Sequence, residues 1–189
     1  MRTRSCLAAL LLAAAIAGCG SQAHSAAPNR STVEADFRGS PAPLASLHAQ
    51  ANQLLGGGPS AFKARLRALR GYPVIVNVWA SWCEPCQSEF PVYQKVAAAY
   101  GRRVAFLGID AQDSNGNAAA FLRRFPLTYP SYTDPHEQIP GSVGGYAGYL
   151  PQTLYFSSGG SRVVAIDGPY LKVGALEKDI NTYLHVSAT

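Results

Sequence analysis

The sequence predicts an α/β fold built around a parallel βαβα unit, with a ββα segment after it. Between residues 73 and 125, strand-like apolar runs alternate with stretches of helical character, which is typical of parallel α/β structure. Between residues 153 and 167, two short strand-like runs are separated by little more than SSGGS, a hairpin-type connection. About 170 residues follow the N-terminal leader, which is enough for one domain with a sizeable core.

Composition and spacing assign the elements of the first half. Residues 73–80, PVIVNVWA, are rich in β-branched residues and fit a buried strand, and residues 103–111, RVAFLGIDA, fit the next one. A helix is expected over about 90–100, and another over 117–125, where Pro126 stops it.

The flanking elements are assigned in the same way. Apolar residues recur at a helical spacing within 44–55 and again within 62–69, which predicts an N-terminal helical extension. Residues 153–156 and 162–167 are the two strands of the second half. A final helix is expected from three apolar residues at i, i+4 and i+8: Leu176, Ile180 and Leu184.

The N-terminus has the features of a secretory signal. Arg2 and Arg4 precede an apolar run from 7 to 17, which fits a signal h-region and is shorter than the roughly 20 residues that cross a bilayer. Small residues directly before Cys19 match the bacterial lipoprotein signal, in which the cysteine is diacylated and becomes the new N-terminus. We therefore expect a signal peptide over 1–18 and lipidation at Cys19; an ordinary cleaved signal with a chance cysteine is the alternative.

The rest of the chain is expected to lie outside the cytoplasm. Residues 19–43 are rich in Ser, Ala and Pro, which indicates a lipidated N-terminus and flexible tether. Residues 44–189 form the predicted folded domain. The lipid would hold this domain at the outer face of the bacterial cytoplasmic membrane, in the periplasm or cell envelope. The formal charge of +5 includes two arginines of the signal, so the remaining basic excess is weak and predicts no nucleic-acid partner.

With Cys6 and Cys19 assigned to the leader and the anchor, the domain has only Cys83 and Cys86. A disulfide between residues so close in sequence stabilises a fold little, so the pair indicates redox chemistry. Cys83 is predicted at a helix N-terminus, where unpaired N–H groups and the helix dipole favour its thiolate. Cys83 is then the nucleophile, and Cys86 is the resolving thiol that releases the substrate.

Three motifs carry a resemblance to a known family: WASWCEPCQSEFP, the preceding GYPVIVNVW, and the later GYLPQTLYF. Over roughly residues 60–186 the chain resembles the membrane-tethered TlpA/ResA-like thioredoxin-fold thiol-disulfide oxidoreductases of bacteria. The resemblance implies a thioredoxin-like fold, with a mixed four- to five-stranded sheet flanked by helices and the CxxC at the start of the first core helix.

The resemblance also implies roles for residues around the cysteines. Pro151, which follows Leu150, matches the proline with a cis peptide bond beside the active disulfide, where backbone groups near residue 150 pair with an extended substrate; a trans proline that starts a strand is the alternative. Trp82 is expected over the active site, with a core aromatic as the alternative. Tyr146 and Tyr149, in the Gly-rich stretch before Pro151, are expected to line the substrate groove.

Asn77 stands where cytosolic thioredoxins carry a buried aspartate. The TlpA/ResA-like branch has asparagine there and a glutamate three residues after the second cysteine, which Glu89 matches. Glu89 is therefore expected to exchange protons with Cys83 or Cys86. The alternative is a first-turn carboxylate that only complements the helix dipole.

The predicted function is reduction of disulfides in exported proteins, apocytochrome c among them by resemblance, with a membrane electron donor that regenerates the dithiol. Glu84 and Pro85 favour this direction weakly, and a disulfide-forming oxidase is the competing hypothesis. Copper handling through Cys83, Cys86 and His136 is less favoured, because the cysteines of such proteins are usually further apart. A thiol peroxidase is also less favoured, because Ala80 occupies the expected Thr or Ser position. A binding module without redox chemistry is the non-enzymatic alternative. No metal and no cofactor is predicted.

Overall fold

The computed structural model describes residues 30–187, in which one six-stranded sheet has the order β1-β4-β3-β2-β5-β6. The strands are β1 Leu54–Leu55, β2 Val74–Trp79, β3 Ala105–Ala111, β4 Ser131–Asp134, β5 Gln152–Phe156 and β6 Arg162–Asp167. The helices are α1 Arg30–Asp36, α2 Ala42–His48, α3 Gly58–Ala68, α4 Glu84–Tyr100, α5 Asn115–Arg124, α6 Gln138–Ser142 and α7 Val173–Leu184. None of the helices within residues 30–187 is long and apolar enough to span a bilayer.

Strand β2 lies at the centre of the sheet and is buried along its whole length. It pairs in parallel with β3 and antiparallel with β5, so the parallel and antiparallel halves meet at this strand. β5 and β6 form the antiparallel hairpin that SSGGS predicts. The expected mixed sheet is thus present, and the CxxC directly follows its central strand.

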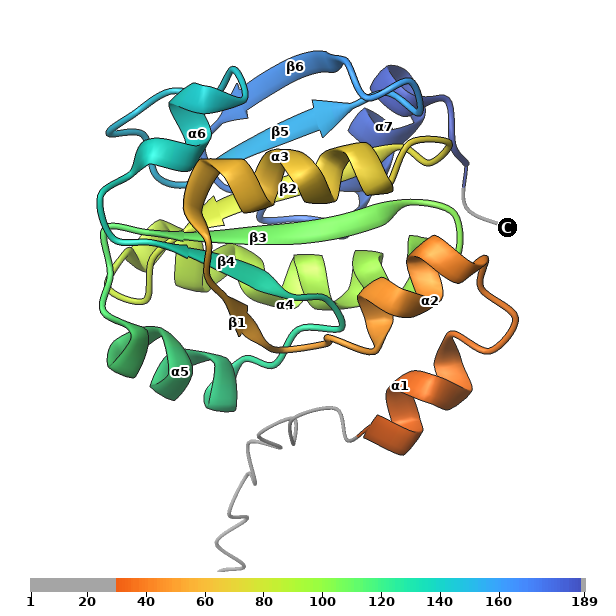
Figure 1. The fold of residues 1–189 in the computed structure, drawn as a ribbon, viewed down its shortest axis with the longest axis horizontal. Helices are drawn as coiled ribbons and strands as arrows, with labels where there is room; N and C mark the ends of the chain where they lie inside the picture. The colour runs from red at the N-terminus through yellow and green to blue at the C-terminus, as the bar shows by residue number, and fades with distance from the viewer. Residues whose placement is uncertain (1–29, 188–189) are drawn as a thin grey trace, which may run out of the picture.

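Alternating side chains of the strands build two apolar layers, one on each face of the sheet. Helices cover both faces, and α3 and α4 lie on opposite sides of the sheet (Figure 1). Ile75 and Trp79 pack with α4, α5 and α7. Val74, Val76 and Val78, from the same strand, pack with α2, α3 and α6 on the opposite face. With both faces covered, β2 has no polar face, which explains its nearly continuous apolar sequence.

Two segments differ from the predicted secondary structure. The helix expected over 44–55 ends at His48, and Leu54–Leu55 instead form the edge strand β1. β1 pairs with β4, a strand that the sequence analysis did not predict. The residues of β4, SYTD, form no apolar run, and they are extended because β1 and β3 bind them on both sides. The short helix α6 was not predicted either.

The predicted flexible tether is wrong for its C-terminal part. Residues 30–36 form α1, and α2 begins at Ala42. Val33 and Phe37 are buried, and the Phe37 ring stacks on His48 with 3.6 Å between ring centroids. His48 in turn donates a 2.8 Å hydrogen bond from Nε2 to the Gly101 carbonyl, at the end of α4. Val33 and Phe37, four positions apart, thus pack α1 against the domain although most residues around them are polar or small.

The signal peptide over 1–18, Cys19 and the tether up to residue 29 lie outside the described residues.

Candidate active site

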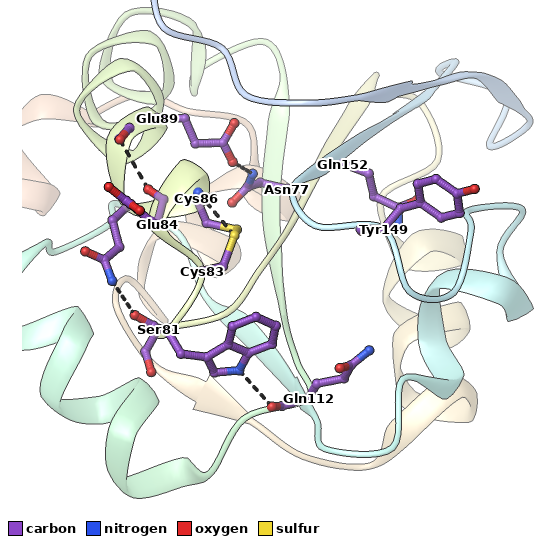
Figure 2. The surroundings of a disulfide bond; sticks show 12 residues. Asn77, Ser81, Cys83, Glu84, Cys86, Glu89, Gln112, Tyr149 and Gln152 are labelled. Atoms are coloured by element: carbon purple, nitrogen blue, oxygen red, sulfur yellow. Dashed lines mark hydrogen bonds between the residues drawn. A yellow bond between two sulfur atoms is a disulfide. The ribbon is translucent and has the colours of Figure 1, made fainter.

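The two cysteines form a disulfide at the beginning of α4 (Figure 2), with their Cα atoms 5.2 Å apart. Cys83 is the N-cap residue, and its Sγ accepts a 3.2 Å hydrogen bond from the backbone N–H of Cys86. Cys83 is 4% exposed, whereas Cys86 is completely buried. Cys83 is therefore the sulfur nearer to solvent, and it lies where the N–H groups of the helix end stabilise a thiolate.

Cys83 lines a surface cleft with a volume of about 290 Å³. The cleft is lined by Trp82, Cys83, Glu84, Pro85, Gln112, Gly148 and Leu150. The Leu150–Pro151 peptide bond is cis, as the resemblance implies. Trp82 is 56% exposed, so it is a wall of the cleft and not a core aromatic. The cleft therefore joins the CxxC turn to the loop before Pro151.

Glu89 lies one helical turn after Cys86 and has no exposed surface. Its Oε1 accepts a 2.5 Å hydrogen bond from the Asn77 side-chain amide, and its Oε2 accepts a 3.1 Å bond from the backbone N–H of Tyr170 (Figure 2 shows the Asn77 contact). Burial raises the pKa of Glu89 to about 8, although both hydrogen bonds oppose the shift. Glu89 is thus an internal acid, not an exposed first-turn carboxylate.

Buried tyrosines lie near Glu89, and the sequence analysis did not predict them: Tyr170 donates to it through its backbone N–H, and the charge of Glu89 acts on Tyr93 and Tyr129. The Tyr93 hydroxyl lies 2.6 Å from Thr153 Oγ1, and Tyr155 donates a 2.9 Å bond to Tyr170, whose own hydroxyl donates to Asp179 at 2.6 Å. Burial, and then the charge of Glu89, raise the pKa of Tyr93. These tyrosine hydroxyls therefore stay protonated at the pH values at which Glu89 titrates. In the sequence, the only hint of these tyrosines is Glu89 itself, an acidic residue on the apolar face of the helix that became α4.

A second buried acid, Asp110, was also missed. It is 1% exposed and is the next-to-last residue of β3. Burial, and then the negative charge of Asp113, raise the pKa of Asp110 to about 8. Asp113 accepts 2.7 Å hydrogen bonds from the backbone N–H groups of Ser81 and Ser114, so it ties the segment before Trp82 to the start of α5.

The loop before Pro151 is held in place by the side chain of Gln152, the first residue of β5. Gln152 accepts a 2.9 Å hydrogen bond from the backbone N–H of Tyr146 and donates to the carbonyls of Tyr146 and Tyr149. The tyrosine rings are about half exposed, and they contact each other edge to face with 5.9 Å between centroids. They flank the cleft but do not line it.

The alternative with a copper ion would bring His136 to the two cysteines. Within residues 30–187, no group of three or more His, Cys, Asp or Glu side chains is placed to hold a metal ion.

Comparison with known proteins gives one family match and several relatives. The model of the AhpC/TSA family matches residues 39–161. The thiol-disulfide oxidoreductase ResA of Geobacillus thermodenitrificans is 31% identical over 109 residues, which cover 57% of this chain and 62% of the relative. The thiol:disulfide interchange protein DsbE of Pseudomonas fluorescens is 34% identical over 93 residues, 49% of each chain. The chain thus spans less than two thirds of the length of these relatives.

Solved structures have the same fold. A thiol:disulfide interchange protein of the thioredoxin family from Chlorobium tepidum superposes with a TM-score of 0.55 at 24% identity, covering 62% of this chain and 83% of that one. A DsbF homologue from Corynebacterium diphtheriae gives a TM-score of 0.51 at 25% identity, with 62% and 75% covered. The predicted thioredoxin-like α/β fold is confirmed.

Proposed function

Because the chain belongs to the AhpC/TSA family, we propose that it is an extracytoplasmic thiol-disulfide oxidoreductase that reduces disulfides of exported proteins. The observation that carries the proposal is the Cys83–Cys86 disulfide, formed at a helix N-terminus beside a cleft bounded by Leu150. The printed names of the ResA and DsbE relatives describe the same chemistry.

The first step is attack by the Cys83 thiolate on a substrate disulfide. The substrate S–S bond breaks, a mixed disulfide forms between Cys83 and one substrate sulfur, and the other substrate sulfur leaves as a thiolate that takes a proton. Cys83 is suited to this step because it is the cysteine that lines the cleft and because α4 stabilises its charge.

The second step is attack by Cys86 on the mixed disulfide. The bond between Cys83 and the substrate breaks, the substrate leaves with its second sulfur as a thiol, and the Cys83–Cys86 disulfide forms. The substrate has gained two electrons, and the protein has lost them. Cys86 is fully buried, so its thiol needs a group inside the protein that accepts its proton.

Glu89 is that group in the proposal. It lies three residues after Cys86 on α4, a spacing that places side chains on one helix face. With a pKa of about 8, its carboxyl exists in both protonated and ionised forms near neutral pH, as a group that accepts and returns a proton must. The Asn77 amide holds the carboxylate in place as it ionises.

The location and the partners belong to the proposal as well. A lipid on Cys19 would keep the domain at the outer face of the membrane, and a membrane electron donor would return two electrons to the Cys83–Cys86 disulfide. The substrates are exported proteins with disulfides, with apocytochrome c as the candidate that the resemblance suggests.

An equilibrium redox titration of Cys83 and Cys86 tests the direction of the reaction. Tryptophan fluorescence is a suitable signal, since Trp82 lines the cleft and Trp79 ends the strand before it. A potential near or below about −270 mV supports a reductant, whereas a value towards about −120 mV makes the protein an oxidase that forms disulfides. Insulin reduction that survives Cys83→Ser would contradict both.

A further inference from the structure

Two residues beside the cleft have a backbone conformation that is unusual for their type. Gln112 and Glu137 both have φ 54°, in the left-handed region that non-glycine residues seldom adopt. Their backbone N–H groups donate to the same acceptor, the Asp134 carbonyl, at 3.1 and 3.0 Å. The shared acceptor keeps the two residues side by side, and an uncommon conformation at such a place indicates a functional demand.

A continuous series of hydrogen bonds runs through this pair from one wall of the cleft to the other. On one side, the Trp82 indole N–H donates to the Gln112 carbonyl at 3.0 Å (Figure 2 shows the contact at Gln112). In the middle, the Gln112 side-chain amide donates to Glu137 Oε2 at 2.5 Å. On the other side, Glu137 Oε1 accepts a 2.7 Å bond from the backbone N–H of Gly148.

The ends of this series are the parts of the cleft that face a substrate. Trp82 stands next to Cys83, and Gly148 lies three residues before Pro151. Both line the cleft, together with Gln112 itself. Gln152, in β5, binds the loop at Tyr146 and Tyr149. Glu137 binds the same loop at Gly148 and, through Gln112, connects it to Trp82 beside the CxxC turn.

We propose that Gln112 and Glu137 form a brace that fixes the spacing of the two cleft walls, and that they are positioning residues for the docking of protein substrates. The inference rests on the proposed function. Neither side chain touches the sulfur atoms, so the brace sets how well an extended polypeptide fits between Trp82 and the loop before Pro151. It leaves the exchange chemistry of Cys83 and Cys86 unchanged.

The test compares a large and a small disulfide substrate. Glu137→Ala removes the acceptor for Gln112 and Gly148. Gln112→Asn shortens the amide and keeps a residue that tolerates the left-handed conformation. The double exchange Gln112→Glu with Glu137→Gln restores one donor facing one acceptor in the middle of the brace. Glu177→Ala, on α7 and outside the cleft lining, is the matched control.

Each single variant should raise KM for insulin by roughly threefold to tenfold. Glu137→Ala, whose site lies outside the cleft lining, should leave kcat, the redox potential and the rate with 5,5′-dithiobis(2-nitrobenzoate) unchanged. The double exchange should return KM to within about twofold of the original protein. An unchanged KM in both single variants, or an equal loss with the small disulfide, would overturn the brace. Absence of activity in the original protein with both substrates would instead refute the proposed function.

Discussion

The Asn77 side-chain amide donates a 2.5 Å hydrogen bond to Glu89, and the two residues come from adjacent elements, β2 and α4, that flank the CxxC turn. Asn77 cannot itself accept a proton, and its Oδ1 has no hydrogen-bond partner within residues 30–187. Of the two residues, only Glu89 has a side chain that can accept and return a proton, which is the role proposed for it.

Replacing Glu89 by Gln should remove the step near pH 8 from the pH profile of mixed-disulfide resolution. The carboxyl has a pKa of about 8, so its ionised form gains population as the pH rises through that value, and only this form accepts the Cys86 proton. Resolution at pH 8 should slow on the order of 100-fold, the contribution of a positioned general base. Stopped-flow kinetics measures the rate, and Glu177→Gln, on α7 and outside the cleft lining, is the control. A pH profile that Glu89→Gln leaves unaltered would show that Glu89 has no proton role.

Replacing Asn77 by Leu should raise the pKa of Glu89 further. The hydrogen bond from Asn77 lowers the pKa of Glu89, and an apolar side chain of similar volume removes this bond without adding a charge. The midpoint, followed by 13C NMR of the Glu89 carboxyl in the oxidised protein, should rise above 8. A midpoint that falls would mean that Asn77 does not stabilise the carboxylate.

Replacing Asp110 by Asn should make the free energy of unfolding less dependent on pH. Burial raises the pKa of Asp110 from 3.8 to about 8, so the folded protein holds a proton that the unfolded chain releases between these values. Stability therefore falls as the pH rises from about 4 to 8, by about 1.4 kcal/mol per pH unit for one proton. Urea unfolding at pH 5 and pH 7.5 should show Asp110→Asn gaining stability relative to the original protein as the pH rises, and the exposed Asp36→Asn should not. The same slope in Asp110→Asn and the original protein would mean that Asp110 is ionised in the folded state.

Replacing Phe37 by Ala should lower the free energy of unfolding by about 2 kcal/mol, the typical contribution of one buried aromatic side chain. Phe37 is 4% exposed and stacks on His48, which is bonded to the end of α4. Thermal unfolding compares this variant with Arg38→Ala, whose side chain is exposed. Equal stability of the two variants would restore the idea of a flexible tether up to residue 43.

Local patterns in the sequence predict the central part of this fold well. Strand β2 is a run of β-branched residues and was assigned with nearly correct ends. The final helix was predicted from Leu176, Ile180 and Leu184, which are the buried residues of α7. The polar strand β4 was missed because its pairing with β1 and β3, and not its own composition, makes it extended.

The candidate site divides in the same way. Cys83 and Cys86 follow from one motif, whereas Tyr170 reaches Glu89 from 81 residues away in sequence. The contact between Gln112 and Glu137 likewise joins residues that are 25 positions apart in the sequence. No local spacing encodes these contacts, so only the structure shows them.

The measurement that tests the central claim most directly is covalent trapping of the mixed disulfide. The reduced Cys86→Ser variant is mixed with insulin and analysed by mass spectrometry, with Cys83→Ser as the matched variant. The account predicts that Cys86→Ser accumulates an insulin adduct on Cys83 and that Cys83→Ser forms none, because Cys83 lines the cleft and Cys86 is buried. No adduct on Cys83, or an adduct on Cys86 in Cys83→Ser, would contradict it.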